Sequence, residues 1–298
     1  MADLLIAGGA ADGNLGWLAS TASRLGYAVE TLLVDADTPP GFAWDLATGR
    51  ARLDGRPLEA RAAFVRYDVF PQLKGGTAGA IASAMAWYAA VTAFCDAEGV
   101  FTLNRGISPI SASKPAMLRK AAACGLAIPA TLVTNSEADA RTFATGPGIA
   151  KPVAGGSYVV SLDEAIGGTK WESGRAPSPA IVQPMLAYPE RRIYRVGTQF
   201  FVFDIASRTL DSRLDGDMQI TPLGTETLDP TVLGGLARLT DEIGCDFCAV
   251  DMKTDPGSGA LLFLELNSSP MFLAYDKAAG GAMSEAMVRY LIGRGEPA

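Results

Sequence analysis

The stretch from Ala249 to Asn267 constrains the fold of this chain more than any other. Two runs rich in apolar residues flank the segment D-P-G-S-G at 255–259, and a cluster of Pro and Gly is typical of the tight turn in a β-hairpin. Asp251 and Glu265 are equidistant from Ser258 in the sequence. A hairpin centred on Ser258 therefore sets these two carboxylates opposite each other on neighbouring strands.

Period-2 alternation places Asn267 on the same strand face as Glu265, so three oxygen-bearing side chains converge with Asp251. Opposed carboxylates repel unless a positive charge lies between them, and Mg²⁺ binds one or two carboxylates together with phosphate oxygens. These residues favour a site for a metal and a nucleotide. Charged residues on strands usually face water, so a solvated sheet face is the alternative that this stretch alone leaves open.

Size and charge limit the class of protein. A chain of 298 residues can bury a full core and has room for two or three compact units. Its net charge of −7 argues against a broad nucleic-acid surface, because binding many phosphates needs an excess of Lys and Arg. The N-terminus has no basic region before its apolar run, which predicts a first strand and not a signal peptide.

The apolar run 80–95 is slightly too short to span a bilayer and contains Ser83 and Thr92, so we expect a buried helix there. We therefore expect a soluble cytoplasmic protein with no membrane partner and no nucleic-acid partner. The chain contains no histidine, which excludes every histidine-based catalytic triad, general base or metal ligand. Four scattered cysteines do not suggest a disulfide scaffold, and the pair Cys245-x-x-Cys248 is expected to consist of buried thiols.

The first hundred residues predict an α/β unit. A strand at 3–8, a helix at 15–25 and a strand at 28–34 make a βαβ opening, and a helix at 77–97 leads to a strand at 100–103. The glycine-containing segment 8–13 lacks the G-x-G-x-x-G spacing, so no dinucleotide site is predicted. A segment of Gly, Ser and Pro at 106–113 then marks a boundary.

An anion site is predicted beyond that boundary. Lys151 ends a short strand and leads into Gly155, Gly156 and Ser157, so an ammonium and bare backbone N–H groups can approach the same phosphate. A plain surface hairpin is the alternative. Several arginines cluster shortly before the 249–267 hairpin, and guanidinium groups match the geometry of phosphate and carboxylate. These are Arg191, Arg192, Arg195, Arg208 and Arg213.

The order of these features resembles that of the ATP-grasp carboxylate–amine ligases. The motifs that carry the resemblance are N-R-x-I-S-P-x-x-x-S-K-P-A-M-L and T-L-V-T-N, then K-P-x-x-G-G, V-Q-P-M, R-I-Y-R-V-G, D-M-K and F-L-E-L-N. They are most similar to the branch that contains ribosomal-protein glutamate ligases and microviridin-type (graspetide) macrocyclases, which act in the biosynthesis of ribosomally made, modified peptides (RiPPs). The resemblance covers about residues 100–298, whereas residues 1–99 match only in general plan.

The resemblance implies an α/β (α+β) ATP-grasp fold, with an N-terminal pre-ATP-grasp α/β domain and with ATP held between two α+β subdomains. The expected domains are 1–105, a central lid subdomain at 106–182 and a C-terminal subdomain with the metal site at 183–298. By the same resemblance, Lys114, Lys151, Gly155, Gly156, Ser157, Gln183, Pro184 and Met185 bind ATP, Arg192 and Arg213 are catalytic, and Asp251, Glu265 and Asn267 hold the metal. One departure is that Ser212 replaces the tryptophan of the macrocyclases' D-W-R motif.

The implied reaction is ATP-dependent phosphorylation of a carboxylate, followed by attack of an amine or hydroxyl that releases phosphate. The implied cofactors are ATP and Mg²⁺, with Mn²⁺ as a substitute. The implied partners are ATP and a carboxylate-bearing substrate, a precursor peptide or an amino acid, and a homodimer is a further expectation. Two alternatives stay open: a kinase of a small alcohol on the same fold, and an ATP-binding regulatory protein without catalysis.

Overall fold

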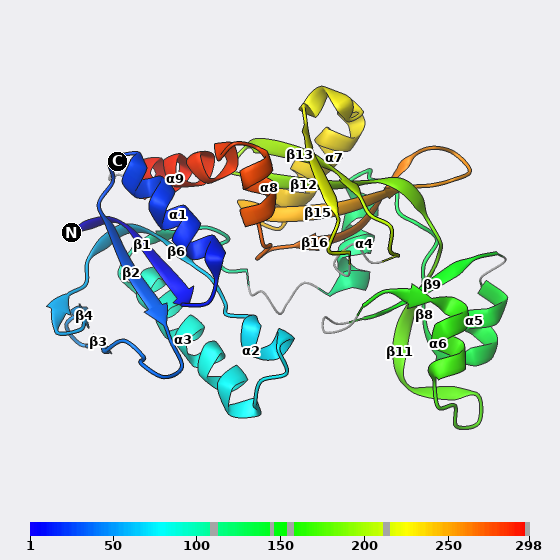
Figure 1. The fold of residues 1–298 in the computed structure, drawn as a ribbon, viewed down its shortest axis with the longest axis horizontal. Helices are drawn as coiled ribbons and strands as arrows, with labels where there is room; N and C mark the ends of the chain where they lie inside the picture. Colours follow the sequence, from blue (N-terminus) through cyan, green and yellow to red (C-terminus); the bar gives the residue numbers. More distant parts are fainter. Residues whose placement is uncertain (108–112, 144–145, 154–157, 211–214, 296–298) are drawn as a thin grey trace.

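The structure is a computed structural model that describes residues 1–107, 113–143, 146–153, 158–210 and 215–295 (Figure 1). Its N-terminal part is built on a parallel sheet with the strand order β2-β1-β6-β7. The strands are β1 (Ala2–Gly9), β2 (Val29–Val34), β6 (Ala60–Val65) and β7 (Phe101–Thr102). Because β1 and β2 pair in parallel across α1 (Gly13–Arg24), the predicted βαβ opening is confirmed. A small antiparallel sheet of β3 (Phe42–Trp44), β4 (Ala51–Leu53) and β5 (Arg56–Pro57) follows β2.

The predicted long helix forms as α3 (Ala78–Ala97), after the short α2 (Phe70–Leu73), but it is not the buried helix that was expected. Its buried residues are Val91, Phe94 and Cys95, which lie near the C-terminal end of the helix and pack on the N-terminal sheet. The rest of the helix stays outside the core because of its composition. Alanine is its commonest residue, and an alanine side chain offers little apolar surface for the sheet to bury. By length and hydropathy alone α3 could also cross a membrane, and a single such helix is weak evidence for that.

A second sheet, antiparallel and with the order β10-β9-β11-β8, lies apart from the first (Figure 1). Its strands are β8 (Leu132–Ser136), β9 (Gly148–Pro152), β10 (Val160–Ser161) and β11 (Arg175–Pro184). The helices α5 (Glu137–Phe143) and α6 (Leu162–Gly168) cover one face, where Ala150 and Val182 join their apolar core. Since side chains alternate along a strand, Lys151 and Gln183 lie on the other face.

The third sheet has five antiparallel strands in the order β14-β13-β12-β15-β16. Its strands are β12 (Ala187–Val196), β13 (Gln199–Ala206), β14 (Gln219–Leu223), β15 (Phe247–Thr254) and β16 (Leu261–Asn267), and a short 3₁₀ helix, η2 (Thr225–Thr227), follows β14. One face packs on α4 (Lys114–Ala123) and α7 (Pro230–Glu242). The other shares a core with α1, α8 (Leu273–Ala278) and α9 (Ala282–Gly295), so the first and third sheets are joined by one apolar core.

The hairpin of β15 and β16 confirms the predicted pairing, with one difference in how it arises. Asp251 pairs with Glu265, whereas near the turn Thr254 pairs with Leu261. A hairpin that continued in the register of the turn would put Leu264 opposite Asp251. A bulge adds one residue to β16 at this point, and it therefore moves Glu265 into register with Asp251.

Arg66 connects the N-terminal sheet to the segment that follows β16. Its side chain is 1% exposed, and its Nε donates to the carboxylate of Asp12 at 2.5 Å. Its Nη1 donates to the backbone carbonyls of Ser269 and Pro270. A buried guanidinium with a carboxylate and two carbonyl partners fixes the position of the chain just beyond Asn267.

We expect Arg66→Ala to lower the free energy of unfolding by about 3–5 kcal/mol, because the Asp12 carboxylate would stay buried without its cation. The matched control is Arg61→Ala, which removes an ion pair with Asp3 at the surface and should cost at most about 1 kcal/mol. Urea denaturation measures both values. Similar small losses in the two variants would contradict this role of Arg66.

Candidate functional site

Charged side chains lie in a row on one face of the third sheet. Arg192 on β12 pairs with Asp251 on β15, and Asp251 pairs in turn with Glu265 on β16. Directly opposed residues of antiparallel strands place their side chains on the same face. The three side chains are therefore neighbours across three adjacent strands, as the hairpin argument required for the two acids.

Each carboxylate of this row is paired with a cation of the protein. Nη1 of Arg192 lies 2.9 Å and 3.1 Å from the two carboxylate oxygens of Asp251. Nζ of Lys114, the first residue of α4, lies 3.1 Å from Oε2 of Glu265. Each of the opposed acids is thus neutralised by a cation of the protein in this structure.

Aromatic rings surround the guanidinium of Arg192. Its Cζ lies 5.4 Å from the ring centre of Tyr194 and 5.3 Å from that of Tyr275, which are cation–π distances. Burial opposes the charge on Arg192, but the Asp251 carboxylate and these two rings outweigh it and raise the pKa of Arg192 above its usual value. Arg192 is therefore a fixed positive charge with two aromatic rings beside it.

Lys151 approaches the same row from the second sheet. Lys151 is 6% exposed, and burial lowers the pKa of its ammonium below the usual value of 10.5. The charges that act on this pKa include Glu265 and Asp251, which raise it, and Lys114 and Lys253, which lower it. The lysine predicted to bind phosphate therefore lies in the electrostatic field of the carboxylate row.

The segment predicted to bind adenine lies at the end of β11, the strand that pairs with the strand of Lys151. Gln183 is 2% exposed, and its Nε2 donates to Oγ1 of Thr131 at 2.9 Å. Pro184 is exposed at the end of β11, and the backbone N–H of Met185 donates to the carbonyl of Pro147 at 2.8 Å. These residues begin the crossing from the second sheet to the third, and their contact with a nucleotide stays a prediction.

Asn267 is the exposed last residue of β16, and its Oδ1 accepts a hydrogen bond from the backbone N–H of Ser269 at 2.9 Å. It follows Glu265 by two residues, which agrees with the predicted shared face. The other predicted site residues lie outside the described part of the chain. They are Gly155, Gly156, Ser157 and Arg213.

Two charged residues next to the row, on the same sheet face, were missed by the sequence reasoning. Glu190 on β12 pairs with Lys253 on β15, and Nζ of Lys253 lies 3.1 Å from Oε2 of Glu190. Nζ of Lys253 also donates to the carbonyl of Leu210 at 3.3 Å. Both positions could have been found by alternation, since each lies two residues from a predicted site residue on the same strand.

The arrangement suits a polyphosphate that carries a divalent cation. Lys114, Lys151, Arg192 and Lys253 supply four cations near Asp251 and Glu265. Among the described residues no group of three or more His, Cys, Asp or Glu side chains could hold a metal by itself. The two paired carboxylates are ligands of the kind that Mg²⁺ takes, since Mg²⁺ binds one or two carboxylates and takes its remaining oxygens from an amide, water or phosphate.

Comparisons with known proteins identify the fold. No family model matches the chain, and a search of curated proteins found no match. Among solved structures, the ATP-grasp ligase PsnB complexed with a minimal precursor is 18% identical, with a TM-score of 0.79 over 99% of this chain and 100% of that one. The macrocyclase MdnC from Microcystis aeruginosa MRC, bound with precursor peptide MdnA, is 19% identical, with a TM-score of 0.74 over 98% and 99%.

A Chryseobacterium gregarium RiPP-associated ATP-grasp ligase in complex with ADP, a leader and a core peptide is also 19% identical, with a TM-score of 0.72 over 100% of this chain and 98% of that one. Each similarity extends over nearly the full length of both chains, the first hundred residues included. The chain therefore has the ATP-grasp fold, and the fold class predicted from its motifs is confirmed.

We expect the affinity for ATP to fall as the pH rises through the lowered pKa of Lys151, because the ammonium then loses the proton that attracts phosphate. Calorimetric titration with a non-hydrolysable ATP analogue from about pH 7 to about pH 10 measures this fall. Lys151→Arg keeps its charge over this range and should flatten the profile. The matched control is Lys170→Arg at an exposed lysine, which should show the same pH dependence as the unaltered protein. A pH dependence of ATP affinity that Lys151→Arg does not change would refute the assignment.

Proposed function

We propose that this protein is an ATP-dependent ligase that activates a carboxylate as an acyl phosphate and joins it to an amine or a hydroxyl. The products are an amide or an ester, ADP and phosphate. The observation that carries the proposal is the row of Arg192, Asp251 and Glu265 on one sheet face. Lys114 is paired with Glu265, and the charges of both acids raise the pKa of Lys151.

Asp251, Glu265 and Asn267 would hold Mg²⁺, or Mn²⁺ as a substitute, and a bound ion of this kind neutralises negative charge on the phosphates of ATP. PsnB was solved with Mg and ADP, which supports the same pair of cofactors here. Lys114 and Lys151 would bind the phosphates, with Gly155, Gly156 and Ser157 covering them. Gln183, Pro184 and Met185 would form the adenine-binding crossing.

Phosphoryl transfer depends mainly on positioning and on neutralising charge, so the residues of the row can serve it without a histidine. Arg192 keeps its charge and is held by Asp251 and two rings, which orients its guanidinium toward Asp251 and any phosphate bound beside it. Arg213 would add a second guanidinium. Once the acyl phosphate has formed, the acceptor attacks its acyl carbon. The bond from that carbon to the phosphate oxygen breaks, phosphate leaves, and the acceptor loses its proton.

A peptide is the proposed carboxylate-bearing substrate. The solved structures of PsnB, of MdnC and of the Chryseobacterium gregarium ligase contain precursor, leader or core peptides. Those peptides belong to those proteins, and the nearly complete overlap of the folds supports the same class of substrate for this chain. We further infer that the chain divides into three domains at 1–105, 106–182 and 183–298. We also infer that the protein is soluble and cytoplasmic and that it forms a homodimer.

The experiment that tests the function is mass spectrometry of reactions with ATP, Mg²⁺ and candidate peptides or amino acids, combined with assays of ADP and orthophosphate. A ligase gives a condensed product that has lost one water, with one ADP and one phosphate for each bond formed. ADP without orthophosphate, together with a phosphorylated product, would instead identify the kinase. Absence of turnover with every acceptor would favour a regulatory nucleotide-binding protein.

We expect Asp251→Asn and Glu265→Gln each to abolish substrate-dependent ADP release, by at least about 100-fold, because each removes a metal-binding charge. The matched control is Asp204→Asn. Asp204 also forms an ion pair with an arginine of β12, Arg191, but on the opposite face of the sheet. Circular dichroism checks the fold of all three variants, and near-normal turnover in either site variant would rule out the metal assignment.

Metal binding should depend on the nucleotide. Because Arg192 and Lys114 already neutralise Asp251 and Glu265, we expect Mn²⁺ alone to bind at least about 10-fold more weakly than Mn²⁺ with a non-hydrolysable ATP analogue. Electron paramagnetic resonance of free Mn²⁺ measures both affinities. Lys114→Ala should strengthen the binding of Mn²⁺ alone, whereas equal Mn²⁺ affinity with and without the analogue would contradict the competition.

A further inference from the structure

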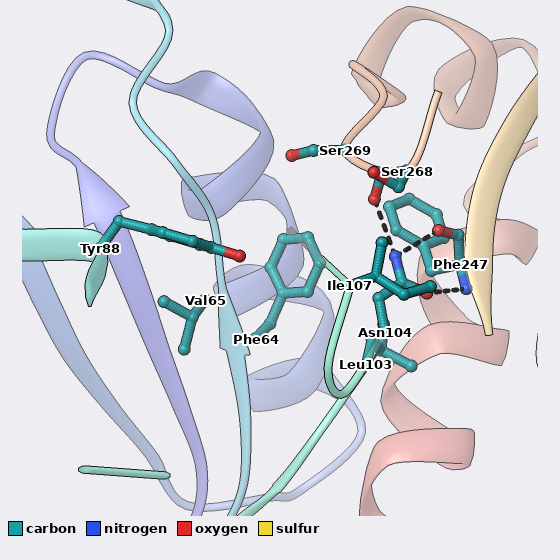
Figure 2. A pocket seen from close by; sticks show the side chains of 9 residues that line it. All are labelled: Phe64, Val65, Tyr88, Leu103, Asn104, Ile107, Phe247, Ser268 and Ser269. Carbon is teal, nitrogen blue, oxygen red and sulfur yellow. Dashed lines mark hydrogen bonds between the residues drawn. The ribbon is translucent and has the colours of Figure 1, made fainter. Parts of the chain in front are cut away.

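A recess lies at the carboxyl ends of β6 and β7, next to the end of β16 (Figure 2). Phe64 and Val65 line it from the end of β6, and Asn104 lines it from the segment after β7. Ser268 and Ser269, which follow the predicted metal ligand Asn267, close its other side. Ligands of open parallel sheets bind outside the carboxyl ends of the strands, so the recess occupies a favourable place one or two residues from the proposed reaction site.

The walls of this recess are held in place by Asn104. Its Nδ2 donates to the carbonyls of Phe247 at 2.6 Å and of Ser268 at 2.8 Å, and its Oδ1 accepts from the backbone N–H of Phe247 at 2.8 Å. Figure 2 shows these bonds crossing from the N-terminal part to the third sheet. Asn104 also has a φ of +55°, a conformation that Asn tolerates better than most residues. The recess is therefore pre-formed, and the Asn104 amide has no free donor for a ligand.

Three hydroxyl groups at the recess do have free capacity. Within the part of the chain that the structure describes, the side-chain oxygens of Tyr88, Ser268 and Ser269 make no hydrogen bond to protein atoms. Figure 2 shows Tyr88 reaching from α3 with its hydroxyl directed toward Phe64. Burial raises the pKa of Tyr88, so this hydroxyl keeps its proton at neutral pH and can donate it. The recess thus combines apolar walls with hydroxyl groups that can bind a small polar group.

The volume of the recess is about 30 Å³, which is room for about two water molecules. A side chain of one or two non-hydrogen atoms fills such a space, and only a hydroxyl among small side chains can also use the free groups. We propose that this recess selects one small side chain of the peptide substrate, with serine preferred to alanine and with leucine and phenylalanine rejected. The identity of the occupant as part of a peptide substrate rests on the proposed ligase function.

The test measures binding without turnover. Saturation-transfer NMR on the full chain, with Mg²⁺ and ADP, compares N-acetyl-L-serinamide with the corresponding alanine, leucine and phenylalanine amides. We expect the serine probe to bind with a dissociation constant on the order of 1 mM and the leucine and phenylalanine probes to show no binding. Tyr88→Phe should weaken binding of the serine probe about fivefold by removing one hydrogen bond. Ser269→Leu should abolish that binding by filling the recess.

Tyr67→Phe is the matched control, because the Tyr67 ring packs edge-on against Tyr88 at 5.9 Å but does not line the recess. It should bind the serine probe as the unaltered protein does. Equal binding of the serine and leucine probes, no effect of Tyr88→Phe, or no binding of the serine probe up to about 50 mM overturns the proposal. Selective binding without ADP release would contradict only the ligase, and ADP release with a peptide but without selective binding would contradict only the recess.

Discussion

The charge row across β12, β15 and β16 depends on strand register, and the proposed chemistry depends on that row. A shift of one residue in either strand pair would turn its side chains to the opposite face of the sheet, into the core formed with α4 and α7. The bulge in β16 is therefore what forms the row, since it pairs Glu265 with Asp251 although the turn alone would pair Leu264 with it. Burial of the alternate residues on the other face, such as Val250 and Met252, fixes the register of β15.

The N-terminal part contributes to the same site by holding the segment after β16. Arg66 and Asn104 donate to carbonyls of this segment, and Oδ1 of Asn14 accepts from the backbone N–H groups of Phe272 and Leu273. The hydroxyl of Tyr194, which lies beside Arg192, donates to the carbonyl of Met271 at 2.6 Å. Asn267 is thus followed by a segment that is fixed from two sides.

The sequence was sufficient for the features that local patterns encode. Turn chemistry predicted the hairpin, and a turn centred on Ser258 predicted the pairing of Asp251 with Glu265, which the structure reaches through the bulge in β16 instead. A strand end followed by glycines indicated Lys151. It could not predict the bulge, because an extra residue in a strand depends on how both strands pack, nor the ion pair of Lys114 with Glu265, which joins residues distant in the chain. Helix α3 was expected to be buried because its hydropathy is high, but alanine contributes hydropathy without giving a neighbouring sheet much surface to cover.

Anomalous diffraction from crystals grown with Mn²⁺ and a non-hydrolysable ATP analogue tests the central claim most directly. If the paired acids are the metal site, the anomalous difference map has a peak about 2.1 Å from carboxylate oxygens of both Asp251 and Glu265. Lys114 and Arg192 should then contact phosphate oxygens. A bound analogue with no anomalous peak at these two carboxylates, and with Arg192 and Lys114 still paired to them, would contradict the account.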